Sequence, residues 1–267
     1  MGIENLDKIF NPKRIAVIGA SNNEVSVGYR LLKNLIGVGF KGFVYPINPF
    51  SPCIQGVTAY PSVKKIPWQV DLAIIATPAH VVSQIVEECG ESGIPGIIVI
   101  SSGFKETGSE GRALEEEIQK TRHAYNMRII GPNCLGVMRP SISLNATFSG
   151  KMAKPGKIAF ISQSGSLCSS ILDWAVQANI GFSHFVSVGS MLNVDFADLI
   201  DYFGADPETR SILLFIESIS DARRFMSAAR RFAGTKPIIV MKAGASPEGT
   251  KAATLHTGTP TGEDSIY

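Results

Sequence analysis

The clearest indication of fold in this chain is the segment Ile158-Ala159-Phe160-Ile161-Ser162-Gln163-Ser164-Gly165-Ser166. Its apolar half is continuous rather than alternating, which is typical of a strand buried on both faces of a parallel sheet. Its polar half leads directly into residues 167–176, where apolar side chains recur at the spacing of one helical face. The segment therefore predicts a β-strand that is followed at once by an α-helix.

The same succession recurs along the whole chain. Apolar runs rich in Val and Ile predict strands at residues 14–18, 71–76, 96–100, 212–216 and 237–241, with weaker candidates at 43–47, 128–130 and 185–188. Helical patterns lie between them, at residues 31–36, 81–89, 110–122, 199–203 and 222–232. Strands that alternate with helices in this way predict an α/β fold with doubly wound, mainly parallel sheets.

The series of strands and helices restarts near the middle of the chain. Residues 138–156 are rich in Gly, Pro and Ser and show no clear periodicity, and a fresh strand begins at Lys157. We therefore expect a boundary near residue 146, with one α/β domain at residues 1–146 and a second at residues 147–267. A chain of 267 residues is long enough for two domains of ordinary size.

Composition argues against several classes of protein. Hydrophobic residues make up 45% of the chain and charged residues 18%, which are globular values. The net charge of +2, without any basic tract, gives no reason to expect nucleic acid as a partner. The four cysteines are scattered without metal-ligand spacing, so neither a metal site nor a disulfide framework is predicted. The sequence shows no signal core and no apolar run of membrane-spanning length, which predicts a cytoplasmic protein without membrane contact.

The loops after the first two strands predict a nucleotide-bearing ligand. Ligands of open α/β sheets bind at the carboxyl ends of the strands. The first strand is followed by Gly19-Ala20-Ser21, small residues that let backbone amide groups approach a phosphate. The spacing is not that of the G-x-G-x-x-G motif, and the second strand ends at Asn48 rather than at the acidic residue that holds an NAD ribose. This favours a ligand other than NAD; the alternative is that the glycines serve only helix packing.

Three further strand ends in the first domain carry small or polar residues. They are Thr77-Pro78, Ser102-Gly103 and Asn133-Cys134. The Asn133 side chain can present both a hydrogen-bond donor and an acceptor. We expect these residues to line the ligand site. His80 is explained equally well as a solvent-facing residue at the start of a helix, so it is not included.

The turn Ser164-Gly165-Ser166 in the second domain predicts an anion site. Small residues and hydroxyl groups at a helix start combine free amide groups with the positive end of the helix dipole. A phosphate is the favoured ligand. The alternative is simple N-capping of the helix, and the flanking residues of a serine-nucleophile G-x-S-x-G motif are absent.

Glu217 and His256 are the candidates for reaction chemistry in the second domain. Glu217 follows a wholly apolar strand, where burial of a lone carboxylate is costly and a neighbouring imidazole would relieve the cost. The alternative for Glu217 is capping of the next helix. His256 lies among Gly, Thr and Ala residues, a setting that suits reversible phosphoryl transfer better than a core position. The alternative for His256 is an ordinary surface or core histidine.

Several motifs occur together and in a fixed order. They are Ile130-Gly131-Pro132-Asn133-Cys134-Leu135-Gly136, Ser162-Gln163-Ser164-Gly165-Ser166-Leu167, Lys242-Ala243-Gly244 and His256-Thr257-Gly258. From about Phe10 onward, the chain resembles the NDP-forming acyl-CoA synthetases, the superfamily of succinyl-CoA ligase and ADP-forming acetyl-CoA synthetase. The resemblance implies a Rossmann-like CoA-binding domain followed by a flavodoxin-like domain with a phosphorylated histidine.

The resemblance also implies roles for single residues. His256 would be phosphorylated, Glu217 would orient it, and Ser164, Gly165 and Ser166 would bind the phosphoryl group. Contacts to CoA would come from residues of the first domain, namely Gly19, Ala20, Ser21, Asn48, Thr77, Pro78, Ser102, Gly103, Asn133 and Cys134.

Partners follow from the same resemblance. ADP or ATP with Mg would bind to an ATP-grasp domain or subunit outside this sequence. The second domain is expected to be incomplete at its C-terminus. The complete enzyme is expected to be an oligomer. CoA or acyl-CoA would be the small-molecule partner, with the acyl group left open. Two alternatives remain: a CoA-binding regulatory module fused to an acetyltransferase, and an NAD-dependent oxidoreductase, which the missing acidic residue disfavours.

Overall fold

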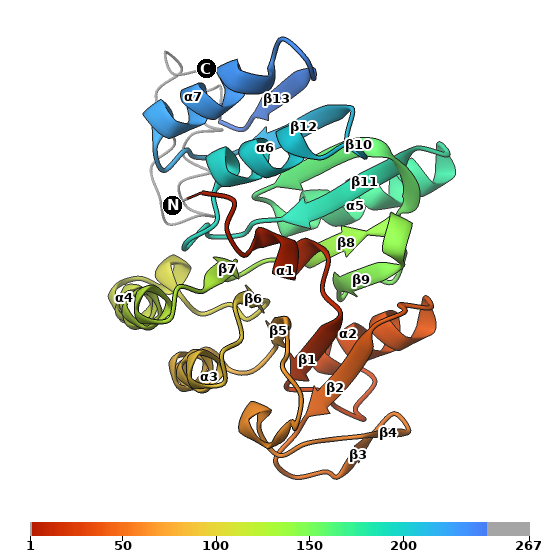
Figure 1. The fold of residues 1–267 in the computed structure, drawn as a ribbon, viewed down its shortest axis with the longest axis vertical. Coiled ribbons are helices and arrows are strands. Elements are labelled where there is room, and N and C mark those ends of the chain that lie inside the picture. Colours follow the sequence, from red (N-terminus) through yellow and green to blue (C-terminus); the bar gives the residue numbers. More distant parts are fainter. Residues whose placement is uncertain (1, 245–267) are drawn as a thin grey trace.

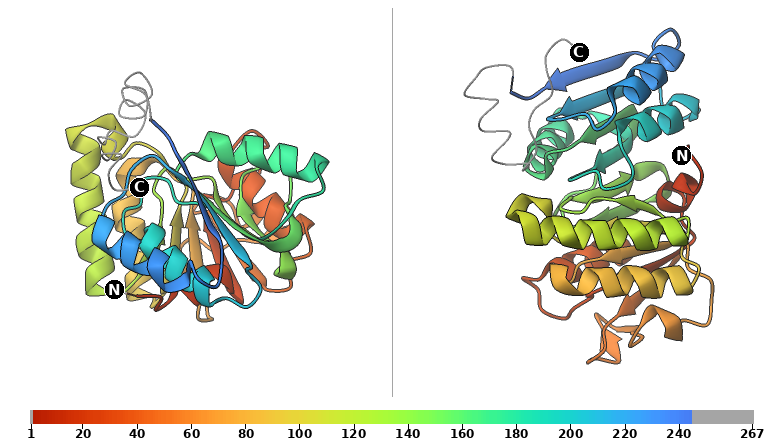
Figure 2. Two further views of the ribbon diagram at one scale, coloured as in Figure 1. Left: turned by 90° about the horizontal axis from the view of Figure 1, so that it is seen from above. Right: turned by 90° about the vertical axis from the view of Figure 1, so that its left-hand side faces the viewer.

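The structure is a computed structural model that describes residues 2–244, so Met1 and residues 245–267 lie outside the described residues. Two main sheets follow one another along the long axis of the molecule, the first built from the N-terminal part of the chain and the second from the C-terminal part (Figure 1). Helices lie on both faces of the sheets (Figure 2). The predicted α/β fold is confirmed.

The first sheet has five strands in the order β2-β1-β5-β6-β7, and each neighbouring pair is parallel. Its strands are β1 (Arg14–Ile18), β2 (Phe43–Ile47), β5 (Leu72–Ile75), β6 (Gly96–Val99) and β7 (Arg128–Ile130). The helices that connect them are α2 (Val27–Gly37), α3 (Ala79–Glu91) and α4 (Ser109–Ala124). Helices α3 and α4 pack side by side on one face of the sheet, and α2 lies on the other (Figure 1).

The second sheet has six strands in the order β13-β12-β10-β11-β8-β9. Strands β10 (Lys154–Ser162), β11 (Gly181–Ser187), β12 (Ser211–Ile216) and β13 (Ile238–Lys242) pair in parallel. Strands β8 (Gly136–Arg139) and β9 (Leu144–Thr147) form an antiparallel hairpin along β11. Helix α5 (Gly165–Gln177) covers one face, and helices α6 (Phe196–Ala205) and α7 (Ala222–Phe232) pack together on the other.

Short elements complete the described chain. They are α1 (Leu6–Phe10), the small hairpin of β3 (Cys53–Ile54) with β4 (Val57–Thr58), and the 3₁₀ turns η1 (Val63–Lys65), η2 (Lys105–Thr107) and η3 (Pro140–Ile142). The turn η2 is important for the site because it follows the carboxyl end of β6.

The hairpin β8–β9 lies in a region where the sequence shows no clear periodicity. All four residues of β9 are buried, so its side chains do not alternate between core and solvent, and period-2 patterning is absent. Strand β8 precedes residue 146 and β9 spans it, yet both strands belong to the second sheet. The division into domains at residues 1–146 and 147–267 therefore stays a prediction, while the strands change sheets between β7 and β8.

Contacts between the two sheets set the geometry of the space between them. A single cluster of buried apolar residues includes members of both sheets. The ring of Phe10 in α1 lies 5.0 Å from the ring of Phe203 in α6. Nearby, Arg128 of β7 forms a buried ion pair with Asp198 of α6, with 2.6 Å between Nη2 and Oδ2. The strand ends of the two sheets are therefore held in a defined relation.

Candidate functional site

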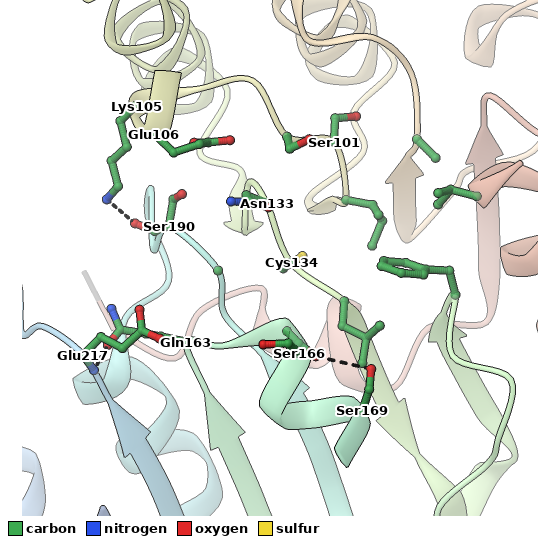
Figure 3. A pocket seen from close by; sticks show the side chains of 18 of the residues that line it. Ser101, Lys105, Glu106, Asn133, Cys134, Gln163, Ser166, Ser169, Ser190 and Glu217 are labelled. Atoms are coloured by element: carbon green, nitrogen blue, oxygen red, sulfur yellow. Dashed lines mark hydrogen bonds between the residues drawn. The ribbon is translucent and has the colours of Figure 1, made fainter. Parts of the chain in front are cut away.

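A pocket of about 600 Å³ lies where strand ends of both sheets meet. Its walls come from segments that follow the carboxyl ends of strands, at residues 76–78, 100–102, 105–106, 133–135, 163, 165–166, 169, 189–190 and 217–218, together with Val27 and Phe148. Figure 3 shows side chains of the first sheet pointing into this space from one side and side chains of the second sheet from the opposite side. This is the position at which open α/β sheets bind ligands.

The N-terminus of α5 forms part of the wall supplied by the second sheet. Ser164 caps the helix, because its Oγ accepts a hydrogen bond from the backbone N–H of Leu167 at 3.2 Å. Gly165 and Ser166 line the pocket, whereas Ser164 does not. The first amide groups of a helix have no partner within it, so this end of α5 offers donors and a positive dipole to an anion. N-capping and an anion site coexist here, and the phosphate-binding roles remain predictions.

Glu217 lies at the carboxyl end of β12 and is 6% exposed. Its backbone N–H donates to Oε1 of Gln163 at 2.6 Å, and the backbone N–H of Ser218 donates to the same oxygen at 2.9 Å. Gln163 thereby fixes the loop after β12 against the turn that begins α5. Helix α7 is capped by Asp221, so the structure does not support the alternative that Glu217 is the cap.

The wall supplied by the first sheet contains Thr77, Pro78, Ser102, Asn133 and Cys134, all of them predicted ligand contacts. Asn133 is exposed and points into the pocket (Figure 3), while its backbone N–H donates to the carbonyl of Ser101 at 2.9 Å. Burial raises the pKa of the Cys134 thiol to about 12. Cys134 is therefore part of the wall and is unsuited to act as a nucleophile.

Two atoms in this wall have unusual surroundings. Oγ1 of Thr77 and Oε2 of Glu106 are buried without a hydrogen-bond partner among the described residues. The other carboxylate oxygen of Glu106 accepts from the backbone N–H of Gly103 at 2.7 Å. Buried polar atoms are normally paired. Both residues line the pocket, so these two atoms are candidate contacts for a ligand with hydrogen-bonding groups.

The remaining predicted contacts lie outside the pocket lining: Gly19, Ala20, Ser21, Asn48 and Gly103. Asn48 donates through Nδ2 to the carbonyl of Ala20 at 2.9 Å and so links the ends of β1 and β2. A Cβ atom at Gly19 would lie 2.5 Å from the carbonyl oxygen of Ala76, and its φ is +86°. Packing therefore requires this glycine, and the CoA contacts of these five residues remain predictions.

Sequence reasoning did not select Lys105, Glu106 or Ser190 as site residues, yet all three line the pocket. Nζ of Lys105 donates to the carbonyl of Ser190 at 2.6 Å, across a separation of 85 residues. The only signal in the sequence is their place shortly after β6 and β11. Gln163 was visible in its motif, but its function as a clamp depends on a contact with the distant β12.

The described histidines lie outside the pocket lining. His80 and His123 are exposed. His184 is buried on β11, 4.5 Å from the ring of Phe203, and burial lowers its pKa to about 4. His256, the predicted phosphorylated residue, lies outside the described residues. Residues 2–244 contain no helix that is long and apolar enough to cross a membrane, and no cluster of three or more side chains suited to a metal ion.

Comparison with known families finds two domains along the chain, with the first match extending through β8 of the second sheet. A CoA binding domain matches residues 13–140, and a succinyl-CoA ligase like flavodoxin domain matches residues 155–267. The alpha subunit of acetate–CoA ligase [ADP-forming] II from Pyrococcus furiosus is 49% identical over 262 residues, which are 98% of this chain and 57% of that protein. The chain belongs to the NDP-forming acyl-CoA synthetase family.

Other members of the acyl-CoA synthetase family are similar to this chain. A 4-hydroxybutyrate–CoA ligase [ADP-forming] from Nitrosopumilus maritimus is 40% identical, over 97% of this chain and 38% of that protein. The solved dinucleotide-forming acetyl-coenzyme A synthetase 1 of Ca. Korarchaeum cryptofilum, in complex with phosphate and ADP, superposes with a TM-score of 0.94 at 43% identity. It is matched over 98% of this chain and 56% of its own length.

The predicted order of a Rossmann-like CoA-binding domain and a flavodoxin-like domain is thus confirmed for this acyl-CoA synthetase family member. The chain spans 57% and 38% of the length of the two curated relatives reported above. The pocket lies between the parts of the chain that the two domain models match.

Proposed function

We propose that this chain is the CoA-binding and phosphohistidine portion of an ADP-forming acyl-CoA synthetase. The complete enzyme would interconvert acyl-CoA, phosphate and ADP with a carboxylic acid, CoA and ATP. The observation that carries the proposal is the pocket whose walls combine strand ends of the CoA-binding domain with the α5 N-terminus and Glu217 of the flavodoxin-like domain. The names of two relatives that are 49% and 45% identical to this chain support it.

CoA would approach along the wall of the first sheet. The unpaired Oγ1 of Thr77 and Oε2 of Glu106 fit a ligand with polar groups, such as the amides of the pantetheine chain. Apolar side chains along the same wall, from Val27, Ala76 and Ile100, suit the hydrocarbon part of that chain. The acyl thioester would then reach the space between Asn133 and Ser166.

Phosphate would bind at the α5 N-terminus beside Gly165 and Ser166. Attack of a phosphate oxygen on the thioester carbonyl forms a C–O bond and breaks the C–S bond, so that the products are acyl phosphate and the CoA thiolate, which then takes up a proton. The helix terminus and its amide groups favour the negative charge of the phosphoryl group throughout this step.

His256 would receive the phosphoryl group in the second step. Its imidazole nitrogen attacks phosphorus while the P–O bond to the acyl group breaks, and the carboxylate leaves. Glu217 would orient the ring and stabilise its positive charge. An ATP-grasp domain or partner subunit would carry ADP or ATP with Mg and accept the phosphoryl group, within an oligomeric enzyme.

Two measurements test the proposal. Calorimetric titration of the purified chain should show binding of CoA and no binding of NAD. Incubation with an ATP-grasp part and ATP labelled at the γ-phosphate should place label on the chain, stable in alkali and labile in acid, with His256 as the labelled residue. Undiminished labelling of a His256→Asn variant would exclude His256 as the acceptor, and a folded chain that ignores CoA would contradict the assignment of the first domain.

A further inference from the structure

Lys105 is the single basic side chain among the described residues that line the pocket. The other charged side chains in that lining are the carboxylates of Glu106 and Glu217. A phosphoryl group placed at the α5 N-terminus would therefore share the pocket with two carboxylates. Like charges repel at short range in a partly buried site, so a cation in the pocket would favour binding of the anion.

The position of Lys105 fits that requirement. Lys105 begins η2 after β6, and its Nζ reaches the carbonyl of Ser190 in the loop after β11 at 2.6 Å. Figure 3 shows it on the wall opposite Ser166, on the side of the pocket where Gln163 and Glu217 lie. An ammonium group has three N–H donors, and the bond to Ser190 uses one of them.

The backbone at Lys105 is held in place. Glu106 accepts a hydrogen bond from the backbone N–H of Gly103, and Oγ1 of Thr107 donates to the carbonyl of Phe104 at 2.8 Å. Oε1 of Glu115 on α4 accepts from the backbone N–H of Lys105 at 3.4 Å. The ammonium group thus extends from an anchored turn. Because the backbone of this turn is already fixed, it needs little reorganisation when an anion binds.

We infer that Lys105 is a phosphoryl-binding residue of this pocket. Its ammonium group binds an oxygen of phosphate or of acyl phosphate from the wall of the first sheet, opposite the α5 N-terminus. The inference rests on the proposed function and adds a contact that crosses from the CoA-binding domain to the reacting phosphoryl group. The binding site for the phosphoryl group is then complete only when both domains are in place.

A purely structural interpretation of Lys105 is that it ties η2 to the loop at Ser190. Two substitutions separate the interpretations. Lys105→Gln keeps an N–H donor that can reach the Ser190 carbonyl but loses the positive charge, whereas Lys105→Met loses both. Lys41→Gln is the matched control, because Lys41 is exposed and lies outside the pocket lining.

The experiment measures the phosphate KM for CoA release from acetyl-CoA in the enzyme assembled with its ATP-grasp part, and the acetyl phosphate KM in the opposite direction. Loss of a charge-assisted hydrogen bond should raise one or both KM values about tenfold in both Lys105 variants. The affinity for CoA should stay within about twofold of wild type, because the CoA phosphates are not the ligand. The two KM values together show which phosphoryl species Lys105 holds.

Either of two results would overturn the inference. One is a Lys105→Gln variant with wild-type KM values for both phosphoryl ligands; the other is a loss of CoA affinity in place of phosphoryl affinity. A wild-type enzyme without phosphate-dependent CoA release would instead reject the proposed function.

A second measurement needs no variant. Inorganic phosphate should protect Lys105 of the wild-type chain from reductive methylation, with Lys41 as the unprotected control, as read by peptide mass spectrometry. Equal methylation of Lys105 with and without phosphate would also overturn the inference.

Discussion

The turns β1–α2 and β10–α5 occupy equivalent places in the two sheets but differ in structure. Each turn follows the first parallel strand of its sheet along the chain, and that strand has a parallel neighbour on both sides. The first covers residues 19–26 and is largely exposed before α2 begins at Val27. The second consists of Gln163 and Ser164, both buried, and α5 begins immediately at Gly165. One strand–helix unit therefore presents a long loop and the other a fixed helix terminus.

The partners of the two turns explain the difference. The β1–α2 turn is supported by Gln55 between β3 and β4, whose backbone N–H donates to Oδ1 of Asn22 at 2.8 Å. The β10–α5 turn is clamped through Gln163 to the loop after β12. The β1–α2 turn is therefore tied to a small neighbouring hairpin, whereas the β10–α5 turn is tied to the end of a central strand of the second sheet.

The largest effect on this comparison is expected from Gly28→Ala in α2. The added Cβ would lie 1.9 Å from the carbonyl oxygen of Gly19, so helix and turn must separate. We expect the free energy of unfolding to fall by about 3 kcal/mol, the upper range for overpacking. Denaturant unfolding checks this, with Gly37→Ala on the same helix as the control, because its Cβ would meet nothing within 4 Å. Equal stability of the two variants would show that the β1–α2 turn is not tightly packed.

Gly165→Ala should lower activity without lowering stability, in contrast to Gly28→Ala. The nearest atom to the added Cβ is 3.8 Å away, so the folded structure accepts it. The methyl group would stand where α5 meets the pocket and would displace a bound phosphate. We expect phosphate-dependent CoA release to fall about tenfold at an unchanged melting temperature. Full activity in this variant would exclude the α5 terminus as the phosphate site.

Substitution of the two capping serines should have smaller effects, and the two variants are closely matched. Ser26 accepts from the backbone N–H of Tyr29 at 3.1 Å, and Ser164 accepts from that of Leu167 at 3.2 Å. Replacing either by Ala should lower stability by about 1 kcal/mol. Only Ser164→Ala should also raise the KM for phosphate, because the proposed phosphate site is at the N-terminus of α5 and not at that of α2. A similar change in KM for Ser26→Ala would remove the functional distinction between the turns.

Thiol labelling should distinguish the surroundings of the turns without any substitution. The carbonyl of exposed Cys53 accepts a hydrogen bond from Asn22 in the first turn at 3.1 Å. Cys168 on α5 is buried, and burial raises its pKa to about 12. Because thiolates are the reactive species, a thiol reagent at pH 8 should modify Cys53 rapidly and leave Cys168 intact until denaturant is added. Rapid modification of Cys168 in the folded protein would show that the α5 region opens.

The sequence predicted the parallel core strands well because their apolar runs are continuous, and β1, β2 and β7 begin and end where expected. The hairpin β8–β9 was missed because burial on both faces removes its alternation. Gly165, Ser166 and Glu217 could be selected from local patterns at strand ends. Lys105 could not, since a lysine in a loop is usually solvated and only the fold brings Ser190 to it.

The order in which segments of the chain contribute to the two sheets limits how chimaeric proteins can be made from this chain and its relatives. Helix α1 precedes the first sheet in sequence but places Phe10 against Phe203 of the second half. Strand β8 precedes residue 146 but pairs with β11, and β9, which spans residue 146, pairs with β8. A recombination point between Ile130 and Gly136 keeps each sheet intact if the segment that contains α1 travels with the second half. A graft made at residue 146 would carry β8 and most of β9 away from β11 and leave an unpaired edge in the recipient sheet.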